Sequence, residues 1–596
     1  MATNQTRRPR RHDHLGPSTD RLWLTLSEEL DGDSPSRCPR FFPVSPARFD
    51  RRRLLETAIA GVIGVELAGA GPSAATTSVA EASRARLPTT VLAEAAALRE
   101  PGSLPNPSAP PGTDQVPQID NFVVVMMENH SFDNILGMLG RGDCFSKGPD
   151  GLPEIELSDG HGNLVHAFHM PSECQTNGVG NNWNLAHHSY DEGTNRGFVE
   201  ASTGEALGYF LGEDLPFTWG MARTFPIADH WFCSVPGQTN PNRRYLLAGT
   251  SLGQVADTNP LDLPPNGTIF DALNRYGITW KEYYSDVPSS GVWLRLLTEP
   301  AIQANIEKIE RFYDDAAAGR LPQFTFIDPS YSHSSEENPQ DIQFGDQFLG
   351  GVVNAVMHGP QWSKTMLIWT YDEWGGWYDH VPPPRAIPPD SVAPELSPNM
   401  ASGAFDRYGF RVPGGVVSPY ARRDHVSHTV YDHTSILKTL ERKWNLPAFT
   451  RRDANAHDLF DMVDLEGPPA YARPPRLPAS ANPARSARCL VTGPGRIPPP
   501  SAIEHGAVPH TPSIAPGALP AGEVGVPYEV TLTSAPRGTS ARWSVLSDDL
   551  PAGLVLGPTT GIISGIPTAS GTSGVTIGVS SDRGPVGAQS YTVVVT

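Results

Sequence analysis

Two short acidic segments of the chain have the residue types to hold a cation. MMENHSFD places Glu128 and Asn129 directly after a run of apolar residues, and WTYDEWGGWYDHVPPP places Asp372 and Glu373 after another. Adjacent acids at the end of a buried strand repel each other unless a cation lies between them. Side-chain oxygens suit a hard divalent cation, so we interpret these four side chains as ligands of a divalent metal of unknown identity. Each segment taken alone also fits a solvated turn.

A threonine lies at a predicted helix start in HWFCSVPGQTNPNRRYLLAGT. Pro241 suits the first turn of a helix, because its missing N–H would have no partner there. Thr239 then falls just before the helix, with Asn242 and Arg243 in its first turn. Free N–H groups at a helix start bind phosphate, and a hydroxyl there can attack phosphorus once its proton is removed. The alternative is that Thr239 only caps the helix.

The elements that must position these residues alternate between strands and helices. Apolar, strand-like runs cover 121–127, 324–328, 365–372 and 414–420, and helical patterns cover 344–359 and 432–445. Strands without strict alternation are buried on both faces, as in a parallel sheet covered by helices. We therefore predict one large α/β domain over 118–465. Ligands at the carboxyl ends of its strands would lie where such sheets place their chemistry.

The chain beyond this domain changes in character. Residues 466–518 are rich in proline and predict an extended linker, as does the Ala/Pro/Ser-rich segment 86–117. Residues 519–596 contain short strands separated by turn residues, which predicts a small all-β sandwich. Its string LPAGLVLGPTTGIISGIPTASGT resembles the immunoglobulin-like modules of secreted bacterial proteins. The resemblance implies a spacer, or contact with a cell surface or polysaccharide.

Residues 1–85 are predicted to carry an export signal. Arg51 and Arg52, followed by Arg53 and a weakly apolar stretch, resemble the twin-arginine motif. This predicts a secreted or cell-envelope protein, whereas the alternative is a basic patch before a buried helix. Four cysteines would remain after cleavage and allow three pairings: Cys144, Cys174, Cys233 and Cys489.

Composition excludes two classes of function. The 596 residues include 45 Lys and Arg against 64 Asp and Glu, a net charge of −19. Such a chain repels a phosphate polyanion, so we expect no binding to nucleic acid. No apolar run reaches the roughly 18–20 residues that a membrane-spanning helix needs, so we expect no transmembrane segment. The sequence also contains neither a Walker-type phosphate loop nor an HExxH motif.

Five motifs in a fixed order carry a family resemblance: ENHSFDNILG, PGQTNPNRRYLLAGT, YDEWGGWYDHVPPP, RVPGGVVSPYARRD and DHTSILKTLE. Together they resemble the bacterial phosphoesterase family, which includes phosphatidylcholine-type phospholipases C and related acid phosphatases. The resemblance implies an alkaline-phosphatase-like α/β/α sandwich over 118–465, followed by the immunoglobulin-like module. It implies a hydrolase of phosphate esters or phospholipids that forms a phosphothreonine at Thr239, with the four oxygen ligands at its metal or phosphate pocket.

The same resemblance implies further catalytic residues. His187 falls where the family pattern has an active-site histidine, with the neighbouring His188 as an alternative. His187 and His380 are candidates for proton transfer, and Asn242 joins Thr239 among the catalytic candidates. Whether the substrate is a phosphomonoester or a phospholipase-type diester stays open.

Two positions depart from the family pattern. His130 stands where an arginine commonly follows Glu-Asn, and Glu-Asn-Pro at 337–339 stands where Glu-His-Pro is common. If that histidine donates the leaving-group proton, His333 or His380 must replace it here.

Two other functions are compatible with parts of the sequence. GTSLG fits the nucleophile elbow of an esterase with Ser251 at its centre, but a helix-like segment precedes it and a loop follows, where the motif needs a strand and a helix. The other rival is a non-catalytic cell-envelope binding protein with a degenerate phosphoesterase domain, which Asn338 favours.

Overall fold

The computed structural model describes most of the two folded parts of the chain. The described residues are 98–140, 149–171, 173–175, 179–481, 513–514, 519–535, 541–547, 550–580 and 586–596. The twin-arginine segment, Cys144 and Cys489 lie outside them. Cys174 forms a disulfide, and Cys233 is a buried free thiol.

An eight-stranded mixed sheet forms the centre of the larger part. Its order is β12 (Val426–Ser427), β6 (Ile227–Ala228), β11 (Gly414–Val417), β10 (Thr365–Tyr371), β1 (Asn121–Met127), β9 (Phe324–Asp328), β7 (Trp280–Tyr284) and β8 (Ile306–Lys308). Only β11 runs antiparallel to its neighbours. The four strands predicted from apolar runs lie together at the middle of this sheet. Every residue of β1 and β10 is buried, as expected for strands covered on both faces.

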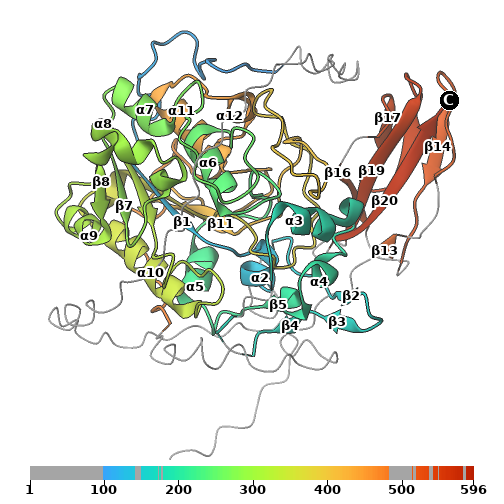
Figure 1. Ribbon diagram of the computed structural model, residues 1–596, viewed down its shortest axis with the longest axis horizontal. Helices are drawn as coiled ribbons and strands as arrows, with labels where there is room; N and C mark the ends of the chain where they lie inside the picture. Colours follow the sequence, from blue (N-terminus) through green and yellow to red (C-terminus); the bar gives the residue numbers. More distant parts are fainter. Residues whose placement is uncertain are drawn as a thin grey trace, which may run out of the picture. The chain divides into compact units, whose positions relative to one another are not determined.

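Helices cover both faces of the sheet (Figure 1). One layer contains α5 (Pro216–Thr224), α9 (Ile309–Ala317) and α10 (Gln343–Met357), and the other contains α6 (Thr239–Ala248), α7 (Ile269–Arg275), α11 (Thr434–Trp444) and α12 (Arg451–Asn455). The apolar residues of α11 recur at helical spacing and are buried against the core. The predicted α/β/α sandwich is therefore confirmed.

Shorter elements fill the connections. They are the helices α2 (Phe132–Leu136), α3 (Trp183–Tyr190), α4 (Phe198–Ala201) and α8 (Pro300–Gln303), the strands β2 (Glu156–Ser158), β3 (Leu164–His166), β4 (Phe168–His169) and β5 (Gly208–Tyr209), and the 3₁₀ turns η1 (Asp191–Gly193), η2 (Gly204–Leu207), η3 (Ser289–Val292), η4 (Leu296–Thr298), η5 (Trp362–Lys364) and η6 (Leu459–Met462).

Two segments that the sequence places in linkers contact the large domain. The buried Lys443 ammonium donates to Asp114 Oδ1 at 2.7 Å and to the Val116 carbonyl at 2.8 Å. In the segment that follows the domain, the Tyr471 carbonyl accepts from the Trp362 indole at 2.9 Å, and the Ala481 N–H donates to the Asp346 carboxylate at 2.8 Å. These two segments pair some of their polar backbone groups by hydrogen bonding to the large domain.

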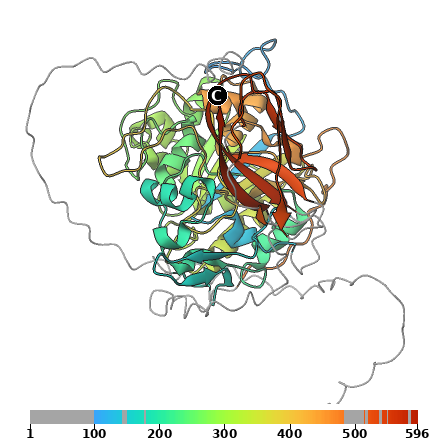
Figure 2. The same ribbon diagram turned by 90° about the vertical axis from the view of Figure 1, so that its right-hand side faces the viewer.

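The C-terminal residues form an all-β module with its own hydrophobic core, as predicted. One antiparallel sheet contains β14 (Tyr528–Thr531), β18 (Ile562–Gly565) and β17 (Leu554–Leu556), and another contains β16 (Arg542–Ser547), β19 (Gly571–Ser580) and β20 (Val586–Val595), with β13 (Ser513–Ile514) pairing with β15 (Ser534–Ala535). The strands are orange to red in Figure 2. Their core contains Trp543, Ile563, Ile577 and Val593.

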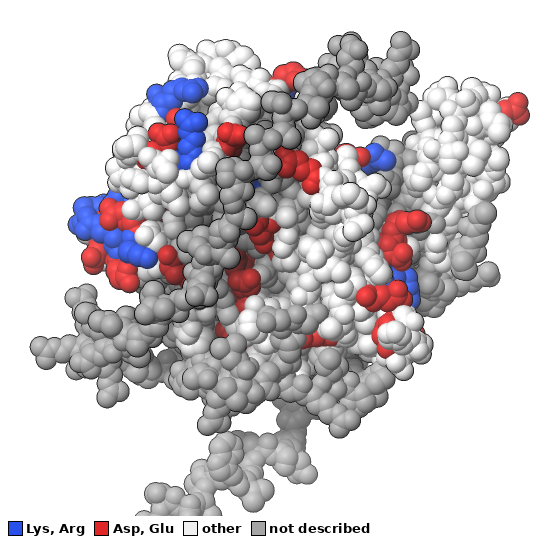
Figure 3. Space-filling view, in the orientation of Figure 1, with Lys and Arg blue, Asp and Glu red and all other residues white. Residues whose placement is uncertain are grey.

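Basic side chains are grouped on the face in Figure 3. One group lies over β8 and α9 with acidic side chains among it, and a second lies at the upper left, while further acidic side chains are scattered across this face. Among the helices that the structure describes, none has both the length and the apolar character to cross a membrane.

Candidate active site

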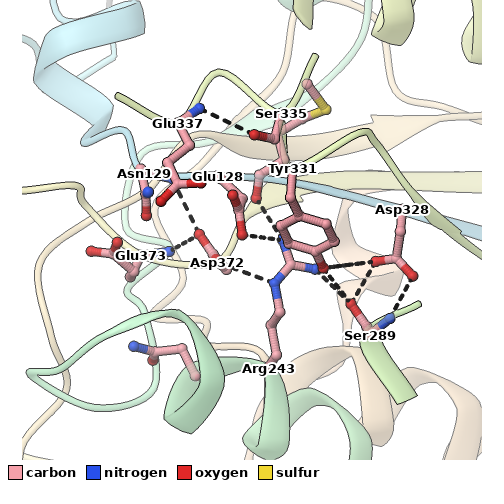
Figure 4. Close-up of polar contacts among 12 residues, drawn as sticks. Glu128, Asn129, Arg243, Ser289, Asp328, Tyr331, Ser335, Glu337, Asp372 and Glu373 are labelled. Carbon is pink, nitrogen blue, oxygen red and sulfur yellow. Dashed lines mark hydrogen bonds and ion pairs between the residues drawn. The ribbon is translucent and has the colours of Figure 1, made fainter. Parts of the chain in front are cut away.

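The two acidic segments meet where β1 and β10 end. These strands are parallel neighbours with Met127 opposite Tyr371, so Glu128 and Asp372 leave the sheet side by side. The Asp372 N–H donates to the Met127 carbonyl at 3.1 Å, and the Asn129 N–H donates to Asp372 Oδ1 at 3.2 Å. The structure therefore brings together the four residues expected to hold a metal (Figure 4).

Unusual backbone conformations allow the two loops to approach. Asn129 has a φ of 65°, in the left-handed region that few non-glycine residues adopt. Gly375 has a φ of 67°, and a Cβ there would lie 1.9 Å from the Asn129 carbonyl oxygen. Its N–H donates to Glu373 Oε2 at 2.7 Å. A glycine is required at this position, and backbone strain of this kind is concentrated at functional sites.

Arg243 on α6 is the positive charge of the site. Its Nε donates to Asp372 Oδ2 at 3.1 Å, Nη1 to Asp328 Oδ1 at 3.2 Å, and Nη2 to Glu128 Oε1 at 3.4 Å. All four side chains are buried. The sequence places Arg243 in the first turn of the helix but does not indicate its role, and Asp328 was not among the predicted site residues. A signal for Asp328 is present, since this acid ends an apolar strand and Glu128 directly follows one.

Negative charge exceeds positive charge around these contacts. Burial, then repulsion from Asp372, raises the pKa of Glu128 and of Glu373 well above the ordinary value. Glu337 lies beside them, and burial, then repulsion from Asp372, raises its pKa to about 7. Figure 4 shows the carboxylates of Glu128, Glu337 and Asp372 close together, whereas that of Glu373 points away from them. A bound cation would relieve this repulsion.

Unpartnered oxygens at the same place fit a divalent metal. Glu128 Oε2 and Asn129 Oδ1 are buried without a hydrogen-bond partner. Both Glu373 oxygens accept hydrogen bonds, from the Asn181 amide and the Gly375 N–H. Buried polar atoms are rarely left unpaired, so the free oxygens indicate a ligand. An all-oxygen donor set is the chemistry of a hard cation.

Thr239 lies at the start of α6. It is the first residue of the helix, with Gln238 as the cap, so the helix begins one residue earlier than predicted. Its side chain is partly exposed, and it lies one turn before Arg243, on the same helix face. The N–H of the next residue, Asn240, donates to Asp257 Oδ1 at 2.8 Å. The Asn240 N–H, one of the helix-start groups expected to bind phosphate, is therefore already bonded to Asp257.

Asn242 contacts the turn that leads into α6. Its Oδ1 accepts from the Val235 N–H at 3.0 Å, and its Nδ2 donates to the carbonyls of Gly237 at 2.9 Å and Gln238 at 3.1 Å. The side chain is completely buried. Asn242, one of the catalytic candidates, thus holds the turn before Thr239.

The two adjacent histidines of α3 have different environments. His187 Nδ1 donates to the Trp183 carbonyl at 2.7 Å, so Nε2 carries the lone pair of the neutral ring. Burial lowers the pKa of His187. His188 is exposed and lies 3.6 Å from Glu200. Asn181, which precedes α3, donates to Glu373 and so links this segment to the acidic cluster.

His380 belongs to a second polar cluster. Its Nδ1 lies 2.7 Å from Asp133 Oδ2 and its Nε2 lies 3.1 Å from Asp150 Oδ1. Arg411 also pairs with Asp133 and with Asp379, at 3.0 and 2.8 Å. Burial alone would lower the pKa of His380, but Asp133 and Asp150 raise it to about 9. Both ring nitrogens are engaged by carboxylates, which leaves neither free for the proton transfer that we expected.

Two histidines bear on the departures from the family pattern. They are His130, which stands where an arginine is common, and His333, a candidate to replace the histidine that is missing at position 338. His130 is buried, with Nδ1 2.6 Å from Asn134 Oδ1 and Nε2 3.1 Å from the Glu336 carbonyl oxygen. Burial lowers the pKa of His130 to about 4. His333 is exposed and packs on Phe344 with 3.9 Å between ring centroids.

The structure does not support an esterase elbow at Ser251. This serine is completely buried, whereas an elbow exposes its nucleophile. Helix α6 precedes it and ends at Ala248, in place of the strand that the motif requires.

The chain resembles known proteins over both of its folded parts. The model of the phosphoesterase family matches residues 119–447, and that of an Ig domain family matches residues 511–596. Non-specific phospholipase C1 of Arabidopsis thaliana is 30% identical over 401 residues, covering 60% of this chain and 74% of that protein. Phospholipase C B of Mycobacterium tuberculosis is 26% identical over 438 residues, covering 62% and 83%. Non-hemolytic phospholipase C of Pseudomonas aeruginosa is 29% identical over 375 residues, covering 55% and 54%.

Among solved structures, a protein of the alkaline phosphatase superfamily from Vibrio parahaemolyticus aligns with 59% of this chain and 74% of its own, at 11% identity and a TM-score of 0.31.

Proposed function

Because the chain belongs to the phosphoesterase family, we propose that it hydrolyses the phosphodiester of phospholipids, as a phospholipase C does, through a phosphothreonine at Thr239. The observation that carries the proposal is the pair of unpartnered buried oxygens, Glu128 Oε2 and Asn129 Oδ1, beside Asp372. These oxygens lie next to Arg243, one helical turn from Thr239. The relatives named phospholipase C support the choice of a phospholipid over a phosphomonoester.

Glu128, Asn129, Asp372 and Glu373 would hold a divalent cation in this proposal. Such a cation, when bound, supplies Lewis-acid chemistry that lowers the pKa of a hydroxyl and offsets phosphate charge. Arg243 donates hydrogen bonds to Glu128 and Asp372 and so holds both carboxylates in place. Asn242 fixes the turn that presents Thr239.

The proposed reaction then consists of two successive displacements at phosphorus. Thr239 Oγ1 attacks phosphorus in line, the bond from phosphorus to the alcohol oxygen breaks, and the alcohol leaves with a proton. Water then attacks the phosphothreonine and releases Thr239, so phosphorus retains its configuration after two inversions. We assign the proton transfers to His187, whose Nε2 carries a lone pair. His380 is not assigned, because both of its ring nitrogens contact carboxylates.

We also propose that the protein is exported and acts outside the cytoplasm. The twin-arginine segment before residue 85 supports this, and so does the disulfide at Cys174, because disulfides persist mainly in oxidising compartments. The C-terminal β module would then contact a cell surface or polysaccharide.

Replacing the threonine tests the reaction directly. Thr239→Ala should lower kcat on p-nitrophenyl phosphorylcholine by about a thousandfold or more, because no hydroxyl remains to attack. Thr239→Ser should keep part of the activity, and Thr258→Ala, in an exposed loop, should keep all of it. Addition of a chelator to the wild type should also abolish turnover. Near-wild-type rates for Thr239→Ala would refute the proposal.

The substrates in the same assay separate the alternatives. Faster turnover of p-nitrophenyl phosphorylcholine than of p-nitrophenyl phosphate supports a diesterase, and the reverse supports a phosphatase. A degenerate binding protein, which Asn338 favours, would hydrolyse neither substrate with any divalent metal added.

A further inference from the structure

A second group of metal-ligand side chains lies at the same edge of the sheet as the proposed active site. Strands β6 and β12 run in the same direction as β10, so their carboxyl ends share that edge. Asp229 and His230 follow β6, and His428 follows β12. These residues take no part in the proposed reaction.

Three ligand atoms converge at this place. His230 Nδ1 lies 2.8 Å from Asp229 Oδ1, and His428 Nδ1 lies 2.8 Å from Asp229 Oδ2. One ligand atom from each residue lies within 4.8 Å of the other two. Two imidazoles from different strands thus point the same ring nitrogen at one carboxylate. This spacing allows one ion to reach all three after small shifts.

The backbone holds the ligands in register. Ala228 pairs with Ser427 in the parallel ladder of β6 and β12. The Asp229 N–H donates to the Ser427 carbonyl at 3.1 Å, and the Tyr431 N–H donates to the His230 carbonyl at 2.9 Å. Backbone hydrogen bonds between the two segments, one at the ends of the strands and one beyond them, therefore flank the ligands. A site carried by paired strands is preorganised for its ligand.

The surroundings favour a cation over a purely structural ion pair. Asp229 is completely buried, and the Asp150 N–H donates to its Oδ2 at 2.9 Å, which fixes the carboxylate. In the described part of the chain, the salt bridges of Asp229 are with the two imidazoles alone. By contrast, the similar group of Asp133, Asp379 and His380 already contains the guanidinium of Arg411.

We propose that Asp229, His230 and His428 bind a borderline divalent metal ion such as Zn²⁺. Two imidazole nitrogens and one carboxylate oxygen are donors that Zn²⁺ takes, usually with four ligands in a tetrahedron. The side chain of His428 is 67% exposed, which leaves the fourth position open to water. The oxygen set at Glu128 suits a hard cation instead, so the chain carries two metal sites of different chemistry.

Cobalt provides the direct test, since Co²⁺ in a tetrahedral site absorbs visible light. Titration of the metal-free full-length protein with Co²⁺ should give these bands, and Zn²⁺ should displace them. His428→Ala removes an exposed ligand and should abolish the bands, while His358→Ala, another exposed histidine, should retain them. Asp229→Asn should also abolish them, with near-ultraviolet circular dichroism to check its fold.

Zinc content separates this site from the proposed active site. After dialysis against micromolar Zn²⁺, His428→Ala should contain one equivalent less than the wild type. Glu128→Gln should retain that equivalent, whatever its activity. Absence of Zn²⁺ binding in the wild type, or an unchanged zinc content and affinity in His428→Ala and Asp229→Asn, would overturn the proposal.

Discussion

Arg243 holds together carboxylates that come from three strands. Glu128 follows β1, Asp328 ends β9 and Asp372 follows β10, and all three contact the one guanidinium. The ring of Tyr331 lies 5.0 Å from it and helps exclude water. A fixed charge of this kind keeps the ligand oxygens preorganised, which is a large part of what a phosphoryl-transfer site needs.

Removing this charge should destabilise the fold. Arg243→Met leaves three buried carboxylates without their cation, so we expect a loss of roughly 3–5 kcal/mol in the free energy of unfolding. Urea unfolding in the presence of chelator measures it. The control is Arg320→Met, whose exposed guanidinium pairs with Asp315 and should contribute about 1 kcal/mol or less. Equal losses for the two variants would contradict this role for Arg243.

His380 should make stability depend on pH above neutrality. Its pKa is about 9 in the folded protein and about 6.5 when exposed, so the folded state binds the proton more tightly. Its contribution, of order 3 kcal/mol, is complete below about pH 6.5 and is lost as pH rises through about 9. Unfolding measured across this range should show the decline for the wild type.

The matched variant for this pH effect is His380→Gln. Glutamine can still donate to Asp133 or Asp150 but does not titrate, so the decline between pH 6.5 and 9 should become smaller. The same slope in both proteins would mean that other groups cause it.

At the scale of elements, the turn before α6 determines where Thr239 lies. The Asn242 amide contacts the backbone at Val235, Gly237 and Gln238, which fixes the entry of the chain into the helix. The sequence predicted this helix start from Pro241, but it could not show that Asn242 closes the turn. Asparagine side chains bind local backbone in many geometries, and spacing does not select among them.

Asn242→Ala should therefore lower kcat more than stability. A shift of Thr239 by about 1 Å can slow the reaction on the order of 100-fold, while the helix itself remains. Steady-state kinetics with p-nitrophenyl phosphorylcholine, together with far-ultraviolet circular dichroism, measures both effects. Asn240→Ala, whose exposed amide donates to Asn259, is the control and should have wild-type kinetics. Unchanged kcat in Asn242→Ala would contradict a positioning role.

The strands and the acids that follow them were predictable, and the side-chain partners were not. Apolar runs identified β1, β9, β10 and β11, because strands buried on both faces lack polar residues. The convergence of Glu128 and Asp372 followed from parallel strands sharing an edge. The pairing of Arg243 with Asp328, and of Asn181 with Glu373, depends on how helices and loops cross that edge, which periodicity does not encode.

For the whole molecule, the comparisons confirm the enzyme class and the family. The sequence also predicted the all-β module at the C-terminal end, which has a separate core and a separate family match. What the module contacts could not be predicted, because a sandwich is specified by its alternating strands whatever its ligand.

Trapping the covalent intermediate tests the central claim most directly. Wild-type protein is mixed with p-nitrophenyl phosphorylcholine, quenched in acid during steady-state turnover, digested and analysed by mass spectrometry. We predict a phosphorylcholine group on Thr239, and none on the same peptide of Thr239→Val. A group attached to any other residue, or none together with inversion at phosphorus, would contradict a threonine nucleophile.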